Sequence, residues 1–173
     1  TTSDVAESAV LSTSVVALVI LGMLISIHSL RQKNFKQGLA RGFVSWIPLM
    51  MVVGWVYGIM GYTGYQINAQ TVTIGALSLG LGVDYAVHFS VRLEEEVELR
   101  PFSSQMVWVT NASATTGRAM FAAALTTAGG FSVLNLSALL PLRLFGQAFV
   151  VAITLALLSS LILLPAFYTP FLK

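Results

Sequence analysis

The sequence predicts an all-α membrane protein, a bundle of five transmembrane helices. Its composition indicates this class, because 56% of the 173 residues are hydrophobic and only 9% are charged, whereas soluble domains carry about 25% charged residues. The apolar residues also gather into five runs, each near the roughly 20 residues that a helix needs to cross a bilayer. The predicted spans cover about residues 9–30, 39–62, 70–91, 118–140 and 144–168.

The first two spans are typical membrane helices that differ in composition. The first is rich in Val, Leu and Ile and runs into the basic residues Arg31, Lys33 and Lys36. The second contains Pro48 and several glycines in its second half. Basic residues after an apolar run indicate where a helix leaves the membrane.

The third span contains the residue around which the chain is organised, Asp84. It is the one acid deep inside an apolar run. A carboxylate at the centre of a membrane helix costs about 2.5–3.5 kcal/mol on insertion scales, so it marks a functional site by default. Ala76, Gly80 and His88 fall on the same i, i+4 ridge. The small residues Ala76 and Gly80, together with Gly82 on a second ridge, predict close approach of another helix.

The stretch 92–117 is too polar to span and is predicted to be a cytoplasmic link. Its glutamates are expected to extend the third helix as a solvated end. After Pro101, apolar residues recur at helical spacing, among them Phe102, Met106, Val109 and Ala112. This spacing predicts a short amphipathic helix on the inner membrane face, and an irregular loop is the alternative.

The last two spans differ in thickness. Ala, Thr and Gly make the fourth span thin, which favours tight packing. We expect it to lie beside the Asp84 helix, with the hydroxyls of Thr126 and Thr127 near the carboxyl group and Gly130 allowing close approach. The alternative is that these hydroxyls bond their own backbone one turn back. The fifth span is rich in Leu and ends near Pro165.

The basic residues predict the orientation. If the first helix enters from outside, eight of the nine Lys and Arg residues fall on the cytoplasmic side and Arg143 alone falls outside. The positive-inside rule then predicts an external N-terminus and a cytoplasmic C-terminus. Because the bases follow membrane topology and form no basic patch, no nucleic-acid partner is expected.

The residues around Asp84 indicate proton chemistry. Burial in hydrocarbon favours the protonated form of a carboxyl group, and Tyr85, about 100° around the helix, can donate to a facing helix. The alternative for Asp84 is a structural hydrogen bond without titration. His88, one turn further on, is a further candidate for the proton relay, and the alternative is that it simply faces water. We expect no enzyme activity, cofactor or metal site, because the chain has no Cys, no nucleophile–base pair and no phosphate loop.

Three stretches carry a resemblance to a known family: GLGVDYAVHFSVRLEEE, TTGRAMFAAALTTAGGFSVL and LLPLRLFGQAFVVAITLALLSSLILLPAFY. They resemble the membrane domain of the resistance-nodulation-division (RND) superfamily, most closely the branch of mycobacterial-type large membrane proteins (MMPL). The sterol-sensing domains of Patched-like proteins are more distant cousins. The match runs from about residue 10 to 168.

The resemblance implies that the chain is helices two to six of one RND half, in a bacterial or archaeal plasma membrane. Such transporters use proton flow to export lipids or other hydrophobic compounds. Asp84 and Tyr85 match the family's Asp-Tyr relay pair, which works with the equivalent pair of the other half. The implied partners are membrane lipids, a hydrophobic or lipid substrate, and either a second half or a second copy.

Three departures from the family pattern keep other functions open. The leading helix, the extracytoplasmic domain and the second half of an RND transporter are not in this sequence. A sterol-sensing or lipid-binding module without active transport is the main alternative, and a structural anchor is the third. The intramembrane Asp-Tyr pair favours the transporter, because an anchor has no need of an acid at this depth.

Overall fold

The fold is a helical bundle. The structure of the protein is a computed structural model that describes residues 2–32, 35–65 and 69–172. It is 93% helical, and the described residues contain no strand. Within these described residues, five helices are long and apolar enough to cross a membrane. The predicted all-α membrane bundle is therefore confirmed.

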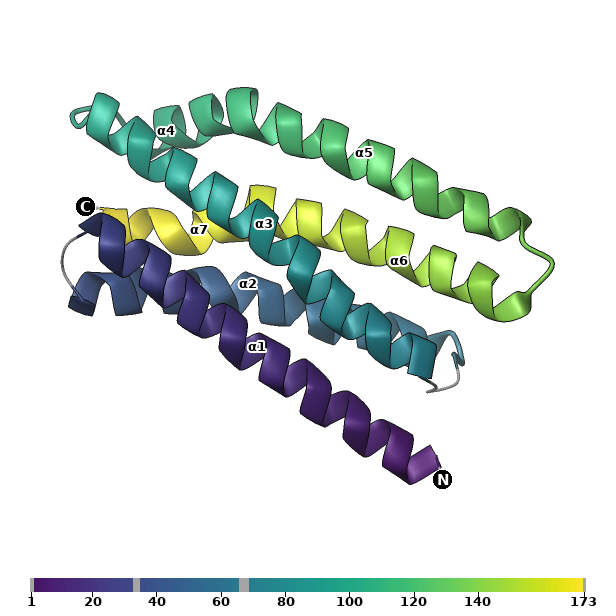
Figure 1. Ribbon diagram of the computed structural model, residues 1–173. Helices are drawn as coiled ribbons and strands as arrows, with labels where there is room; N and C mark the ends of the chain where they lie inside the picture. The colour runs from purple at the N-terminus through teal and green to yellow at the C-terminus, as the bar shows by residue number, and fades with distance from the viewer. Residues whose placement is uncertain (1, 33–34, 66–68, 173) are drawn as a thin grey trace.

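The helices follow one another with short links, and two of the membrane-length helices are composite (Figure 1). The elements are α1 (Thr2–Gln32), α2 (Phe35–Tyr62), α3 (Ala69–Leu99), α4 (Gln105–Ala112), a π-helical turn (Ser113–Gly117), α5 (Arg118–Ser132), a 3-10 turn (Val133–Leu136), α6 (Leu140–Leu158), a second π-helical turn (Ser159–Leu163), α7 (Leu164–Tyr168) and a 3-10 turn (Thr169–Leu172).

The largest difference from the sequence-based bounds lies in the predicted polar link, 92–117. Residues up to Leu99 continue α3, and α4 runs through a π-helical turn directly into α5. Only a short turn around Pro101 separates the two spans, because the residue before a proline is disfavoured in a helix. The short helix after Pro101 exists, but it forms the first part of a membrane-length helix, Gln105–Leu136.

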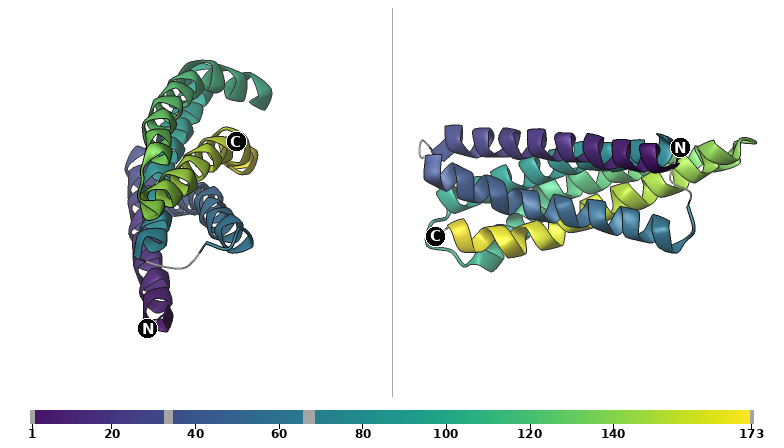
Figure 2. Two further views of the ribbon diagram at one scale, coloured as in Figure 1. Left: turned by 90° about the vertical axis from the view of Figure 1, so that its right-hand side faces the viewer. Right: turned by 90° about the horizontal axis from the view of Figure 1, so that it is seen from below.

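α3 is the central helix of the bundle. It packs against α1, α2 and α6, whereas α5 packs against α6. Seen end-on, α1, α3 and α5 lie along one side, and α2 and α6 lie on the other (Figure 2). The two termini lie at opposite ends (Figure 1), as an odd number of crossings requires. At the end near the C-terminus, α1 ends, α2 begins and α3 ends (Figure 1). We call it the Arg-rich end, because these parts of the chain carry Arg31, Arg41, Arg92 and Arg100.

A close backbone contact joins α1 to α2, near the Arg-rich end. A Cβ added at Gly38 would lie 2.5 Å from Ser29 Cα, and one added at Gly42 would lie 2.8 Å from Ile25 Cα. Both neighbours are backbone atoms, which cannot move aside as a flexible side chain can. The two glycines thus form a small-x-x-x-small motif that lets the two backbones meet.

Gly38→Ala is expected to lower the free energy of unfolding by about 1–3 kcal/mol, because the added methyl group overpacks the contact with α1. Gly58→Ala is the matched control in the same helix, since an added Cβ there meets nothing within 4 Å. Thermal unfolding of both variants in detergent, followed by circular dichroism, measures the difference. Equal melting temperatures would contradict the proposed close contact.

Candidate functional site

The candidate site lies on the outward face of α3. Gly80, Asp84 and His88 are all exposed, and an added Cβ at Gly80 meets nothing within 4 Å. Ala76, one turn earlier on the same ridge, is half-buried. The structure therefore brings the acid, the histidine and the small residue before them onto one open face, which we call the Asp84 face.

Tyr85 has a different position from its neighbour Asp84. Its side chain is buried among the core residues of the bundle. Adjacent residues of a helix point about 100° apart, so α3 directs the acid outward and the phenol inward.

The small residues of α3 do not all serve the same contact. Gly82 is buried, and an added Cβ there would lie 2.9 Å from Leu49 Cδ2 and 3.9 Å from Ala156 Cβ. It is therefore Gly82 that allows α2 and α6 to approach α3. At Gly80, an added Cβ would meet no atom of the described residues within 4 Å.

The fourth predicted span does not pack beside the Asp84 face. Its helix, α5, packs against α6, and Gly130 is exposed. The hydroxyls of Thr126 and Thr127 donate to the carbonyl oxygen of Ala123 at 2.9 Å and 2.8 Å. The structure thus shows the alternative, in which these hydroxyls bond the backbone of their own helix.

A second polar site, which the sequence did not predict, lies at the Arg-rich end. Glu94 was expected to be solvated, but its side chain is only 2% exposed. Its Oε1 lies 3.1 Å from Arg41 Nη1 and 3.2 Å from His28 Nδ1, and accepts the Tyr168 hydroxyl. Arg31 Nε lies 3.2 Å from Oε2 as an ion pair without hydrogen-bond alignment. We call these five residues the Glu94 junction.

The Glu94 junction joins separate helices. His28 and Arg31 come from α1, Arg41 from α2, Glu94 from α3 and Tyr168 from α7. The side chain of His28 is fully buried, and its ring centroid lies 5.6 Å from that of Tyr168. A buried carboxylate is tolerated because cationic and hydroxyl donors surround it.

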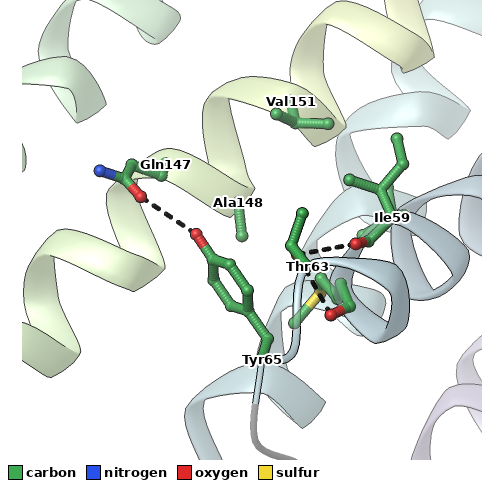
Figure 3. A pocket seen from close by; sticks show the side chains of 8 residues that line it. Ile59, Thr63, Tyr65, Gln147, Ala148 and Val151 are labelled. Atoms are coloured by element: carbon green, nitrogen blue, oxygen red, sulfur yellow. Dashed lines mark hydrogen bonds between the residues drawn. The ribbon is translucent and has the colours of Figure 1, made fainter.

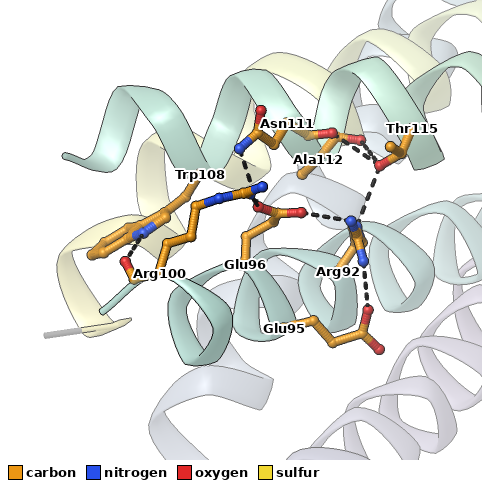
Figure 4. Close-up of polar contacts among 8 residues, drawn as sticks. All are labelled: Arg92, Glu95, Glu96, Arg100, Trp108, Asn111, Ala112 and Thr115. Carbon is orange, nitrogen blue, oxygen red and sulfur yellow. Dashed lines mark hydrogen bonds and ion pairs between the residues drawn. The ribbon is translucent and has the colours of Figure 1, made fainter. Parts of the chain in front are cut away.

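A third polar group, around Glu96, ties α4 to the end of α3 (Figure 4). Arg92 Nη2 lies 2.5 Å from Glu96 Oε1, while Arg100 and Asn111 donate to Oε2. The indole of Trp108 donates to the Arg100 carbonyl at 2.9 Å. These contacts explain why the polar stretch stays helical and packed. The expectation of a solvated end is wrong for Glu96 as well, because its side chain is only 2% exposed.

A small cavity of about 220 Å³ lies near the opposite end, between α2 and α6 (Figure 3). Val56, Met60 and Ala148 line it, and the hydroxyl of Tyr65 donates to Gln147 Oε1 at 3.0 Å beside it. Its volume is below the roughly 300–1,000 Å³ of typical small-molecule sites. It is therefore too small to enclose a sterol-sized ligand.

Metal ligands do not gather anywhere in the part of the chain that the structure describes. No group of three or more His, Cys, Asp or Glu residues is placed to hold a metal ion in residues 2–32, 35–65 and 69–172.

Comparisons with known proteins point to one family. Residues 43–171 match the MMPL family, and this range includes both the Asp84 face and Glu94. A protein of Methanocaldococcus jannaschii, named only as a putative membrane protein, is 33% identical over 121 residues. The aligned part is 69% of this chain and 30% of that relative, so the chain spans about a third of the relative's length. No solved structure matches the chain. The chain belongs to the MMPL family.

Proposed function

We propose that this chain is the membrane module of a proton-driven exporter of the RND and MMPL type, and that it moves lipids or other hydrophobic compounds. In this proposal Asp84 and Tyr85 carry half of an intramembrane proton relay, with His88 as a further candidate. Family membership supports the transporter class. The observation that carries the proposal is an exposed carboxyl group inside a membrane-length helix.

The exposure of Asp84 implies a covering partner. The residue lies inside the span Thr73–Leu99, where an acid facing lipid is costly and such residues almost always face protein or water. The chain's own helices leave the Asp84 face open. A second RND half or a second copy of the chain therefore covers this face, and Gly80 provides the space for it.

Gly80→Leu tests the covering partner. In the chain purified alone, the melting temperature is expected to stay unchanged, because the added side chain enters open space. In the assembled protein the same change is expected to cost about 1–3 kcal/mol through overpacking against the partner. Gly54→Leu, at another open position, is the control. If Gly80→Leu also left the melting temperature of the assembled protein unchanged, no partner would cover the Asp84 face at Gly80.

The experiment on function replaces Asp84 with Asn in the assembled transporter and measures export driven by a pH gradient. Export at the wild-type rate would overturn the proposal. A sensing or lipid-binding module without transport is the alternative, and it predicts lipid binding that does not change in this variant. The small cavity between α2 and α6 does not itself support that alternative, because its 220 Å³ is below the range of typical small-molecule sites.

We place the Arg-rich end of the bundle in the cytoplasm and the N-terminus outside the cell membrane. Four of the six Arg residues, Arg31, Arg41, Arg92 and Arg100, lie at this end of the spans, as the positive-inside rule describes. Because the chain has no cysteine, single cysteines at Gln37 and Thr63, both exposed and at opposite ends, report orientation cleanly. A membrane-impermeant thiol reagent on intact cells is expected to label Thr63→Cys only. Labelling of Gln37→Cys instead would reverse the topology.

A further inference from the structure

The Glu94 junction contains a buried histidine that the proposed relay does not use. His28 lies near the end of α1. On α3, Asp84 lies on the open face, whereas Glu94 lies ten residues further along and is buried. At a rise of about 1.5 Å per residue, these two acids are about 15 Å apart along the helix. The junction is therefore separate from the Asp84 face.

The contacts at Nδ1 define the tautomer of His28. Nδ1 lies 3.2 Å from the Tyr168 oxygen and 3.2 Å from Glu94 Oε1. The Tyr168 hydroxyl already donates its proton to Glu94, and a carboxylate oxygen only accepts. Both neighbours of Nδ1 are therefore acceptors, so we assign the hydrogen of the neutral imidazole to Nδ1.

The other ring nitrogen is left free to change its protonation state. Nε2 lies 3.5 Å from the hydroxyl oxygen of Ser45, in α2. A serine hydroxyl can donate to a bare Nε2 and can accept from a protonated one. His28 can thus gain a proton at Nε2 without losing the contacts of Nδ1. A carboxylate that fixes one nitrogen of an imidazole while the other exchanges a proton is a recurring arrangement in proton-transfer sites.

We propose that His28 is a second proton-binding site of this module, with the proton gained and lost at Nε2. The ionisable groups that face it are Glu94 from α3, Tyr168 from α7, Arg41 from α2 and Arg31 from its own helix. His28 Nδ1 lies 3.2 Å from Glu94 Oε1. Protonation at Nε2 gives the imidazole a full positive charge, which strengthens its attraction to this carboxylate. His28 in α1 and Arg41 in α2 share Glu94 Oε1. Protonation of His28 therefore strengthens the ion pair of Glu94 with α1 relative to its ion pair with α2.

Nitrogen NMR of the full chain, labelled with ¹⁵N-histidine and held in detergent micelles, tests this site. The chain has two histidines, and His88→Gln identifies the His28 signals. Spectra are recorded over the interval from about pH 8 to about pH 5. We expect neutral His28 to be the Nδ1–H tautomer and to gain its second proton at Nε2 when the sample is acidified. An Nε2–H tautomer, or a single protonation state throughout that interval, would overturn the proposal.

Two variants separate this inference from the relay. Tyr168→Phe is expected to keep the Nδ1–H tautomer, because Glu94 remains as acceptor, and a switch of tautomer in this variant would count against the assignment. Asp84→Asn is expected to leave the His28 titration unchanged, because the two sites are separate. A loss of the His28 titration in Asp84→Asn would show that His28 is not an independent site. The wild-type spectrum decides the proposal even if Tyr168→Phe does not fold.

Discussion

Asp84→Asn is expected to reduce proton-coupled export by the assembled transporter to background while its folding stays intact. Asparagine keeps the shape of the side chain but cannot titrate, so the relay loses its proton carrier. Folding is spared because Asp84 lies on the open face of α3, outside the core of the bundle. Tyr85→Phe is expected to reduce export less, since it removes only one hydroxyl from a buried ring.

Two measurements check this result together. Export driven by a pH gradient gives the functional loss, and infrared difference spectra follow the carboxyl C=O band of Asp84 as the pH changes. The band is expected in the wild type and absent in Asp84→Asn. Glu98→Gln is the matched control, because it removes an exposed acid from the same helix and should export normally. Full export by Asp84→Asn without a difference in that band would leave Asp84 only a structural role.

Glu94→Gln is expected to lower the free energy of unfolding by about 3 kcal/mol. Removing one partner of a buried ion pair typically costs about 3–5 kcal/mol, because the other charge stays buried without compensation. Here that charge is chiefly Arg41, whose side chain is 12% exposed, whereas Arg31 is 35% exposed and better screened by water. We therefore expect a loss at the lower end of the range. Glutamine can still accept the Tyr168 hydroxyl, so the loss measures the charge.

Unfolding in detergent, followed by circular dichroism, measures this effect. Glu98→Gln again serves as the control, because it removes the same charge from an exposed position on the same helix. The two variants are expected to differ by most of the predicted loss. Equal stability of Glu94→Gln and Glu98→Gln would mean that the Glu94 junction does not hold the four helices together.

The sequence alone predicted the features that depend on local pattern. The five apolar runs predicted the membrane bundle, because the length and hydrophobicity of a span are properties of one stretch of chain. Asp84 was predicted as a candidate site residue because a single acid in an apolar helix can be recognised without knowledge of its neighbours. The ion pairs of Glu96 with Arg92 and Arg100 follow an i, i+4 spacing that is also present in the sequence.

Tertiary structure decided which polar residues are buried and which face of α3 is open. Glu94 pairs with Arg41 and Tyr168, which are 53 and 74 positions away in the chain, so no local pattern could separate it from the solvated Glu98. Gly80 and Gly82 look alike in sequence, yet only Gly82 meets α2 and α6. The reason is that the burial of a side chain is set by the helices packed around it, and those contacts come from residues far apart in the sequence.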